Sequence, residues 1–319
     1  MGKLFVTIPQ LTPEQRAEIR ETASARGYET RFFNTAAEAL PEIDEAEIIF
    51  GNAPELAGAA VNLRWLCTST AGANQFMAPG AFASPNAVLT NSAGAYGVTI
   101  SEHILMQTLE LMRRELDYRP AFMRREWKQG LPVRSIYGSR VTLLGTGDIG
   151  QETAMRLRGF RPACIVGVNR RGGNPGGLFD RTLKLEAVGE VLPETDLLIL
   201  SLPGTPETFH VLDAERLALL PDGSFIVNVG RGSAIDEAAL AAELRSGRLC
   251  AALDMFEREP LPKDDPLWDC PNLLITAHVA GNMTLAHTQE RIVRLFLEDF
   301  ARYCDGEPLA RRVDMAHGY

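Results

Sequence analysis

The run VTLLGTGDIG at residues 141–150 decides the fold, because it joins an apolar strand pattern to a glycine-rich turn. A helical pattern, QETAMRL at 151–157, follows it directly. Strand, GxGxxG turn and helix in this order are typical of a dinucleotide-binding α/β unit. In such a unit Gly145 permits the tight turn, Gly147 lets the backbone approach a pyrophosphate, and Gly150 lets helix and strand pack closely. The alternative is a glycine-rich turn that binds nothing.

Strand and helix patterns alternate on both sides of this motif. Apolar β-rich runs predict strands at 3–8, 47–50, 64–68 and 88–91 before it, and at 140–144, 164–168, 197–202, 224–229, 249–253 and 273–276 from it onward. Apolar residues at helical spacing predict a long helix over 101–116 and a final helix over 291–303. A polar stretch that contains two prolines lies over 118–137. This alternation predicts parallel sheets covered by helices.

Length and composition narrow the class of protein. The 319 residues favour two domains over one, since single cores stop growing near about 250–300 residues. The net charge of −9 argues against nucleic-acid and anionic-membrane partners. Five widely spaced cysteines, an odd number with no CxxC pair, predict neither a disulfide framework nor a metal site. With no apolar run near the roughly 20 residues of a membrane span, we expect a cytoplasmic protein.

The end of the strand after the glycine motif indicates which cofactor is preferred. An NAD site usually carries an acidic residue about 20 residues downstream, which binds the ribose 2′-OH. Here the strand ends Asn169-Arg170-Arg171, and no Asp or Glu occurs between Glu152 and Asp180. Arginine pairs with a 2′-phosphate. We therefore predict that NADP(H) is preferred and NAD(H) is possible, with the alternative that both arginines are merely solvated.

Three later segments place chemically active residues at strand ends. Arg231 lies between two glycines in NVGRGSAID, Glu259 precedes a proline in ALDMFEREPLP, and His278 follows a strand in ITAHVAG. Open α/β sheets bind ligands at the carboxyl ends of their strands. A guanidinium can bind a carboxylate, and an imidazole can transfer a proton near neutral pH. Glu257 is an alternative to Glu259 as the acidic member of this set.

In order and spacing, GTGDIG and these three runs resemble the D-isomer-specific 2-hydroxyacid dehydrogenases over essentially the whole chain. This NAD(P)-dependent family includes glyoxylate/hydroxypyruvate reductases, D-lactate dehydrogenases and D-3-phosphoglycerate dehydrogenases. The resemblance implies a Rossmann-type doubly wound parallel sheet inserted into a smaller flavodoxin-like α/β domain. The dinucleotide-binding domain would span 98–284, and the substrate-binding (catalytic) domain would combine 1–97 with 285–319. It also implies a homodimer formed through the cofactor domain.

The family's catalytic set maps onto this chain residue by residue. The resemblance implies that Arg231 binds the substrate carboxylate and polarises the carbonyl, that His278 donates the proton, and that Glu259 is the partner of His278. Backbone N–H groups of Ala71 and Gly72 would hold the substrate carboxylate. The family usually has a proline before the histidine, where this chain has alanine at position 277.

A larger set of residues would bind the dinucleotide. Asp254 matches a position that contacts the nicotinamide carboxamide in the family. The expected cofactor-binding residues are Gly145, Gly147, Asp148, Ile149, Gly150, Asn169, Arg170, Arg171, Leu202, Pro203, Thr208, Val229, Gly230, Asp254, Ala280 and Gly281.

The expected function is reduction of a small 2-oxoacid to the D-2-hydroxyacid by hydride transfer from NADPH, as in glyoxylate, hydroxypyruvate or 2-ketoacid reductases. A D-lactate or D-3-phosphoglycerate dehydrogenase is the alternative within the family. Formate dehydrogenases share the fold but typically lack the glutamate, so Glu259 argues against that branch. An NAD(P)-sensing interaction protein of the corepressor type is the alternative from another class.

Overall fold

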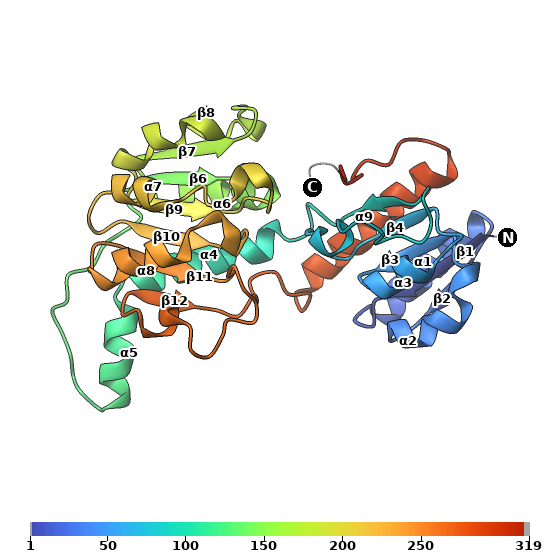
Figure 1. The fold of residues 1–319 in the computed structure, drawn as a ribbon, viewed down its shortest axis with the longest axis horizontal. Coiled ribbons are helices and arrows are strands. Elements are labelled where there is room, and N and C mark those ends of the chain that lie inside the picture. Colours follow the sequence, from blue (N-terminus) through green and yellow to red (C-terminus); the bar gives the residue numbers. More distant parts are fainter. Residues whose placement is uncertain (1, 316–319) are drawn as a thin grey trace. The chain divides into compact units, whose positions relative to one another are not determined.

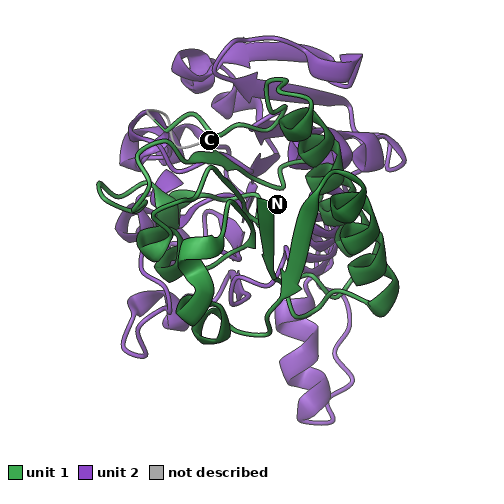
Figure 2. Cartoon of the chain, turned by 90° about the vertical axis from the view of Figure 1, so that its right-hand side faces the viewer, with its two compact units in different colours: residues 1–96, 283–319 green, residues 97–282 purple. Residues whose placement is uncertain are grey.

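The computed structural model describes residues 2–315, which form two compact units (Figure 2). One unit contains the described residues up to Tyr96 together with those from Met283 onward, and the other spans Gly97–Asn282. Residues 316–319 of the predicted 285–319 segment lie outside the described residues, as does residue 1 of the 1–97 segment. No helix in the described part is long and apolar enough to cross a membrane.

The smaller unit is built on a five-stranded parallel sheet in the order β2-β1-β3-β4-β5, the flavodoxin-like order. Its strands are β1 (Gly2–Thr7), β2 (Tyr28–Phe32), β3 (Ile48–Gly51), β4 (Trp65–Cys67) and β5 (Val88–Thr90). Its helices are α1 (Pro13–Ala25), α2 (Ala36–Ala39), α3 (Pro54–Ala59) and α9 (Ala286–Cys304). The Thr12 hydroxyl and the Gln15 side chain form a capping box at the start of α1.

Helices cover both faces of this sheet. On one face the stacked rings of Phe50 and Trp65 pack on Phe296 of α9. On the other face Ile49, the residue before Phe50, and Leu66, the residue after Trp65, join the cluster under α2 and α3. Because successive side chains of a strand point to opposite faces, these fully buried strands are apolar at every position.

The larger unit has a seven-stranded parallel sheet in the order β12-β11-β10-β9-β6-β7-β8 (Figure 1). Its strands are β6 (Arg140–Leu144), β7 (Cys164–Asn169), β8 (Arg181–Lys184), β9 (Leu197–Leu200), β10 (Phe225–Asn228), β11 (Cys250–Leu253) and β12 (Leu273–Ile275). Its helices are α4 (Gly97–Met112), α5 (Glu115–Met123), α6 (Asp148–Arg158), α7 (Ala214–Leu219) and α8 (Glu237–Arg245). Strand order reverses at β6, where the Rossmann arrangement places its ligand crevice.

Two strands and one helix differ from the sequence prediction. The strands β2 (YETRF) and β8 (RTLK) were not predicted, since both are half-exposed sheet edges without an apolar run. The helix predicted over 101–116 ends at Met112, because Arg114 adopts a left-handed backbone with φ 65°. A separate helix, α5, extends into the start of the polar stretch over 118–137. In Figure 1 it extends away from the sheet of its unit.

Candidate active site

The glycine motif forms the turn between β6 and α6. Gly145 has φ +103°, a conformation that side chains other than glycine rarely adopt. A Cβ on Gly150 would lie 2.2 Å from the Gly145 carbonyl oxygen, whereas a Cβ on Gly147 would meet nothing within 4 Å. Among residues 2–315, no side chain caps α6, whose first residues are Asp148 and Ile149. The turn is therefore closed where helix meets strand and open where a pyrophosphate would approach the helix N-terminus.

The residues at the end of β7 lie at the same carboxyl edge of the sheet as the glycine turn. The Asn169 side-chain amide donates to Thr146 Oγ1 over 2.9 Å and to the Gly173 carbonyl over 2.8 Å. Its Oδ1 accepts the Arg171 N–H at 3.0 Å. Asn169 thus ties the loop after β7 to the glycine turn, and the exposed residues Arg170 and Arg171 follow directly. These two arginines are the cationic groups that the sequence predicts to bind a ribose 2′-phosphate.

The loop after β9 brings the next group of predicted cofactor residues together. The buried Thr208 donates its hydroxyl to the Pro203 carbonyl over 2.6 Å. A Cβ on Gly230 would lie 2.7 Å from both the backbone nitrogen and oxygen of Leu202. The glycine at position 230, which follows the buried Val229, therefore allows the turn after β10 to pack directly on the loop after β9.

A tight backbone turn presents Arg231 at the carboxyl end of β10. Asn228 fixes this turn, because its side chain donates to the Arg231 carbonyl at 2.8 Å and accepts the Gly230 N–H at 3.0 Å. A Cβ on Gly232 would lie 1.8 Å from the carbonyl carbon of Phe256, so only glycine fits there. Burial lowers the pKa of the Arg231 guanidinium, and the negative charge of Glu259 opposes that shift.

Glu259 and His278 form a hydrogen-bonded pair. His278 Nδ1 lies 2.7 Å from Glu259 Oε2, and Glu259 Oε1 accepts the Phe256 N–H at 3.0 Å. Since an ionised carboxylate can only accept, the histidine carries its proton on Nδ1, which leaves Nε2 to act on another group. The His278 side chain is 58% exposed and can be reached by a ligand.

The rival carboxylate Glu257 has a different partner. Its Oε1 lies 2.7 Å from His210 Nε2, and its backbone N–H donates to Glu237 Oε1 at 2.7 Å. Burial raises the pKa of the Glu237 carboxyl group. Alternate residues of the segment therefore serve different histidines, and Glu259 is the one beside His278.

Asp254 lies beneath the histidine turn and is 1% exposed. Its Oδ1 accepts the Val279 N–H at 2.9 Å, and its Oδ2 accepts the Ala280 N–H at 2.9 Å. Gly281 continues the same turn. The contacts described for Asp254 thus hold the backbone that carries His278, while its expected contact with nicotinamide stays a prediction.

The smaller unit carries the predicted carboxylate-binding loop after β4. Its carbonyl oxygens are occupied: Tyr96 donates its hydroxyl to Ser69 O at 2.6 Å, and Asn91 donates its amide to Ala71 O at 2.8 Å. Burial raises the pKa of Tyr96 to about 12, so this hydroxyl keeps its proton at neutral pH. Within the described residues, the backbone N–H groups of Ala71 and Gly72 donate to no protein acceptor. The loop therefore offers donors suited to an anion.

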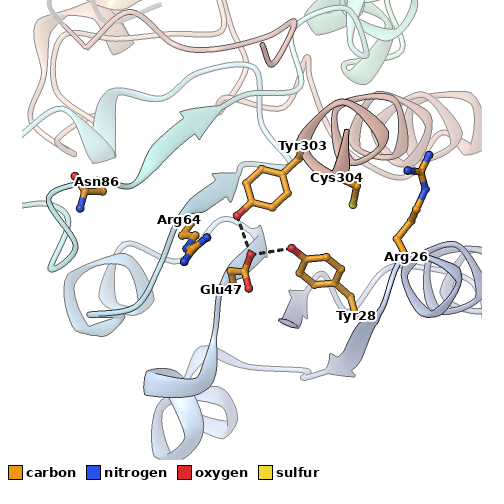
Figure 3. Close-up of a pocket in the computed structure, with 7 residues that line it drawn as sticks. All are labelled: Arg26, Tyr28, Glu47, Arg64, Asn86, Tyr303 and Cys304. Carbon is orange, nitrogen blue, oxygen red and sulfur yellow. Dashed lines mark hydrogen bonds between the residues drawn. The ribbon is translucent and has the colours of Figure 1, made fainter. Parts of the chain in front are cut away.

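A separate pocket of about 770 Å³ lies at the opposite, amino edge of the same five-stranded sheet (Figure 3). Glu47 at its centre accepts hydroxyl hydrogens from Tyr28 at 2.7 Å and Tyr303 at 2.9 Å. Arg26 at its rim pairs with Asp305. The polar groups largely satisfy one another and link β2, β3 and α9, which is a structural role.

Sequence reasoning missed the residues that hold the predicted catalytic side chains in place. Asn228 fixes the Arg231 turn and was overlooked, although a polar residue ending an apolar strand was a visible signal. Thr276 donates to Asp254 Oδ1 at 2.6 Å and accepts from His103 and Gln107 of α4. No local sequence signal links residues about 170 positions apart.

The fold and the site are those of a nucleotide-dependent dehydrogenase, and comparison with known proteins agrees. Over residues 105–280, more than half of the chain, the sequence matches the family model for the D-isomer specific 2-hydroxyacid dehydrogenase, NAD binding domain. The chain belongs to the D-isomer specific 2-hydroxyacid dehydrogenase family, whose members are NAD(P)-dependent oxidoreductases. The predicted family and fold class are thereby confirmed.

Solved structures resemble the chain along its length. A D-isomer specific 2-hydroxyacid dehydrogenase family protein from Aeromonas salmonicida is 32% identical, with TM-score 0.84, covering 98% of this chain and 99% of that one. One from Xanthobacter autotrophicus, in complex with NADPH and MES, is 28% identical, with TM-score 0.83 and coverage of 100% and 99%. An NADPH-dependent glyoxylate/hydroxypyruvate reductase from Sinorhizobium meliloti, in complex with NADP and sulfate, is 27% identical, with TM-score 0.81 and coverage of 100% of both chains.

Proposed function

We propose that this protein reduces a small 2-oxoacid of the glyoxylate, hydroxypyruvate or 2-ketoacid type to the D-2-hydroxyacid, with NADPH as the hydride donor. The observation that carries the proposal is the 2.7 Å contact between His278 Nδ1 and Glu259 Oε2, in the same unit as the glycine turn. A proton donor and a nucleotide-binding turn on one sheet are what carbonyl reduction needs.

NADPH fits the residues present. The open space at Gly147 and the uncapped N-terminus of α6 suit a pyrophosphate. Arg170 and Arg171 would bind the 2′-phosphate, because the end of β7 has no carboxylate to repel it. The relatives from Xanthobacter and Sinorhizobium, crystallised with NADPH and NADP, support this preference. When bound, the cofactor supplies the hydride.

The chain's own residues then manage the negative charge that develops on the substrate oxygen. The Arg231 guanidinium would bind the substrate carboxylate and polarise the carbonyl. His278 Nε2 would deliver the proton to the oxygen, while Glu259 holds the opposite ring nitrogen and stabilises the imidazolium. The N–H groups of Ala71 and Gly72 would also bind the substrate carboxylate.

The test is a panel of 2-oxoacids assayed with NADPH and with NADH. We expect turnover of at least one acid, with a higher kcat/KM for NADPH than for NADH. Turnover with NADH alone would refute the cofactor assignment. Tight NADPH binding without turnover of any acid would refute the enzymatic proposal and favour a nucleotide-sensing protein.

We also propose that the chain forms a homodimer through α5 and the segment that follows it. Phe122, Met123 and Trp127 are 77%, 76% and 90% exposed, and apolar groups gathered on a projecting segment are typical of an interface. Met123→Glu combined with Trp127→Glu should give monomers in sedimentation velocity. Val61→Glu, an exposed site in the smaller unit, should stay dimeric. A monomeric wild-type protein would refute the proposal.

A further inference from the structure

We propose that His103 and Gln107, on helix α4, are positioning residues for His278, acting through Thr276 and Asp254. The inference rests on the proposed role of His278 as proton donor. Helix α4 contributes none of the predicted site residues. In this proposal, α4 holds the turn that carries His278 against the sheet.

The chain of contacts begins at Asp254. Its carboxylate is buried and accepts three hydrogens: from Thr276 Oγ1 at 2.6 Å, Val279 N–H at 2.9 Å and Ala280 N–H at 2.9 Å. Its own carbonyl accepts the His278 N–H at 2.9 Å. The single residue Asp254 therefore binds the chain before, at and after the histidine.

Thr276 connects this carboxylate to α4. Because its hydroxyl hydrogen is given to Asp254, the Thr276 oxygen can only accept from its other neighbours. Gln107 Nε2 lies 3.1 Å and His103 Nε2 lies 3.2 Å from it. His103 therefore carries its proton on Nε2. Burial lowers the pKa of His103, against the opposing charges of Asp254 and Glu110, which favours the neutral ring.

Two features indicate that the network serves the turn and not helix packing alone. His278 has φ 53°, a left-handed backbone that a non-glycine residue keeps only when its surroundings enforce it. Gln107 Oε1 is buried without a hydrogen-bond partner in the part of the chain that the structure describes. Burying a glutamine oxygen without a hydrogen-bond partner destabilises the folded protein. The hydrogen bond that Gln107 donates to Thr276 explains why position 107 is a glutamine.

The consequence is geometric. If Thr276 loses its hydroxyl, Asp254 loses one hydrogen bond and can rotate, and both α4 donors lose their acceptor. The histidine turn can then relax from its left-handed conformation and move His278 Nε2 away from the substrate oxygen. Misplacement of about 1 Å can cost roughly 100-fold in rate, while substrate binding through Arg231 remains.

The experiment compares Thr276→Val with Thr276→Ser and with Thr108→Val as a matched control. Thr108 is a buried threonine of α4 whose hydroxyl has no hydrogen-bond partner among the described residues. We expect Thr276→Val to lower kcat roughly 10- to 100-fold with little change in the oxoacid KM. Thr276→Ser should restore kcat, and Thr108→Val should match wild type. His103→Leu should lower kcat in the same direction, and this variant decides the matter if Thr276→Val does not fold.

Amide hydrogen exchange supplies a readout that needs no turnover. The Ala280 amide should exchange faster in Thr276→Val than in wild type, Thr276→Ser or Thr108→Val. Unchanged exchange and unchanged kcat in Thr276→Val would overturn the inference, as would equal losses of kcat in Thr276→Val and Thr108→Val. If the wild-type protein reduces no 2-oxoacid, the proposed function fails. Amide exchange at Ala280 still tests whether Thr276 stabilises the turn that carries His278.

Discussion

Replacing Gly232 with alanine tests whether the close packing of Gly232 on Phe256 positions Arg231 and Glu259, two of the proposed catalytic residues. The added methyl carbon would lie 1.8 Å from the carbonyl carbon of Phe256 and 2.2 Å from its oxygen. Carbon atoms in contact are about 3.5–4.0 Å apart, so the two backbone segments must separate by roughly 2 Å. The movement reaches both sides of the site, because Gly232 follows Arg231 and the Phe256 N–H binds Glu259 Oε1.

We expect Gly232→Ala to lower kcat for 2-oxoacid reduction by about 100-fold or more, since a 1 Å misplacement can already cost that much. The atoms that the new methyl group meets are backbone atoms, so the free energy of unfolding should fall by at least the roughly 1–3 kcal/mol that is typical of overpacking. NADPH oxidation gives kcat, and urea unfolding gives stability.

The matched control is Gly189→Ala in the same unit, where the nearest atom, Leu219 Cδ1, would lie 3.8 Å from the new Cβ. This is an ordinary van der Waals distance, so the control should keep wild-type kcat. A folded Gly232→Ala variant with wild-type kcat would refute the reasoning, because the segments would then tolerate separation without displacing Arg231 or Glu259.

Three further predictions concern charge. Glu259→Gln removes the negative charge facing His278, so kcat for reduction should fall while the NADPH Kd stays unchanged; an unchanged kcat removes Glu259 from the mechanism. Arg170→Ser with Arg171→Ser should raise the Kd for NADPH roughly tenfold or more, from the usual strength of charged hydrogen bonds, in a fluorescence titration. Equal weakening of NADH would contradict the assignment to the 2′-phosphate. Burial lowers the pKa of His103 in the folded protein. As the pH falls below about 6.5, the unfolded chain therefore protonates this histidine before the folded protein does, and the free energy of unfolding should fall. His103→Gln should lose less stability than wild type between neutral and mildly acidic pH in urea unfolding, and equal losses would contradict the prediction.

The sequence allowed the central part of the fold to be predicted because that part is buried on both faces. The strands around the glycine turn are apolar at successive positions, as parallel strands between two helical layers must be. Edge strands need no such pattern, which is why Tyr28–Phe32 and Arg181–Lys184 were missed. The helix break at Arg114 has no glycine or proline to signal it, since the left-handed residue is an arginine.

For the site, the sequence indicated the residues that we propose to be catalytic but not those that hold them in place. Arg231, Glu259 and His278 stand at strand ends in recognisable runs. The position before Pro260 favoured Glu259 over Glu257 in the sequence, and the structure adds the hydrogen bonds that pair Glu257 with His210 and Glu259 with His278. The contact of His103 with Thr276 joins α4 to the residue that follows β12, and only tertiary structure can bring them together.

The most direct test of the central claim is the rate of hydroxypyruvate reduction by His278→Gln, measured together with its affinity for NADPH. If His278 is the proton donor, kcat should fall by roughly 100-fold or more, while the NADPH Kd matches wild type. A variant that binds NADPH normally and reduces hydroxypyruvate at the wild-type rate would contradict the account.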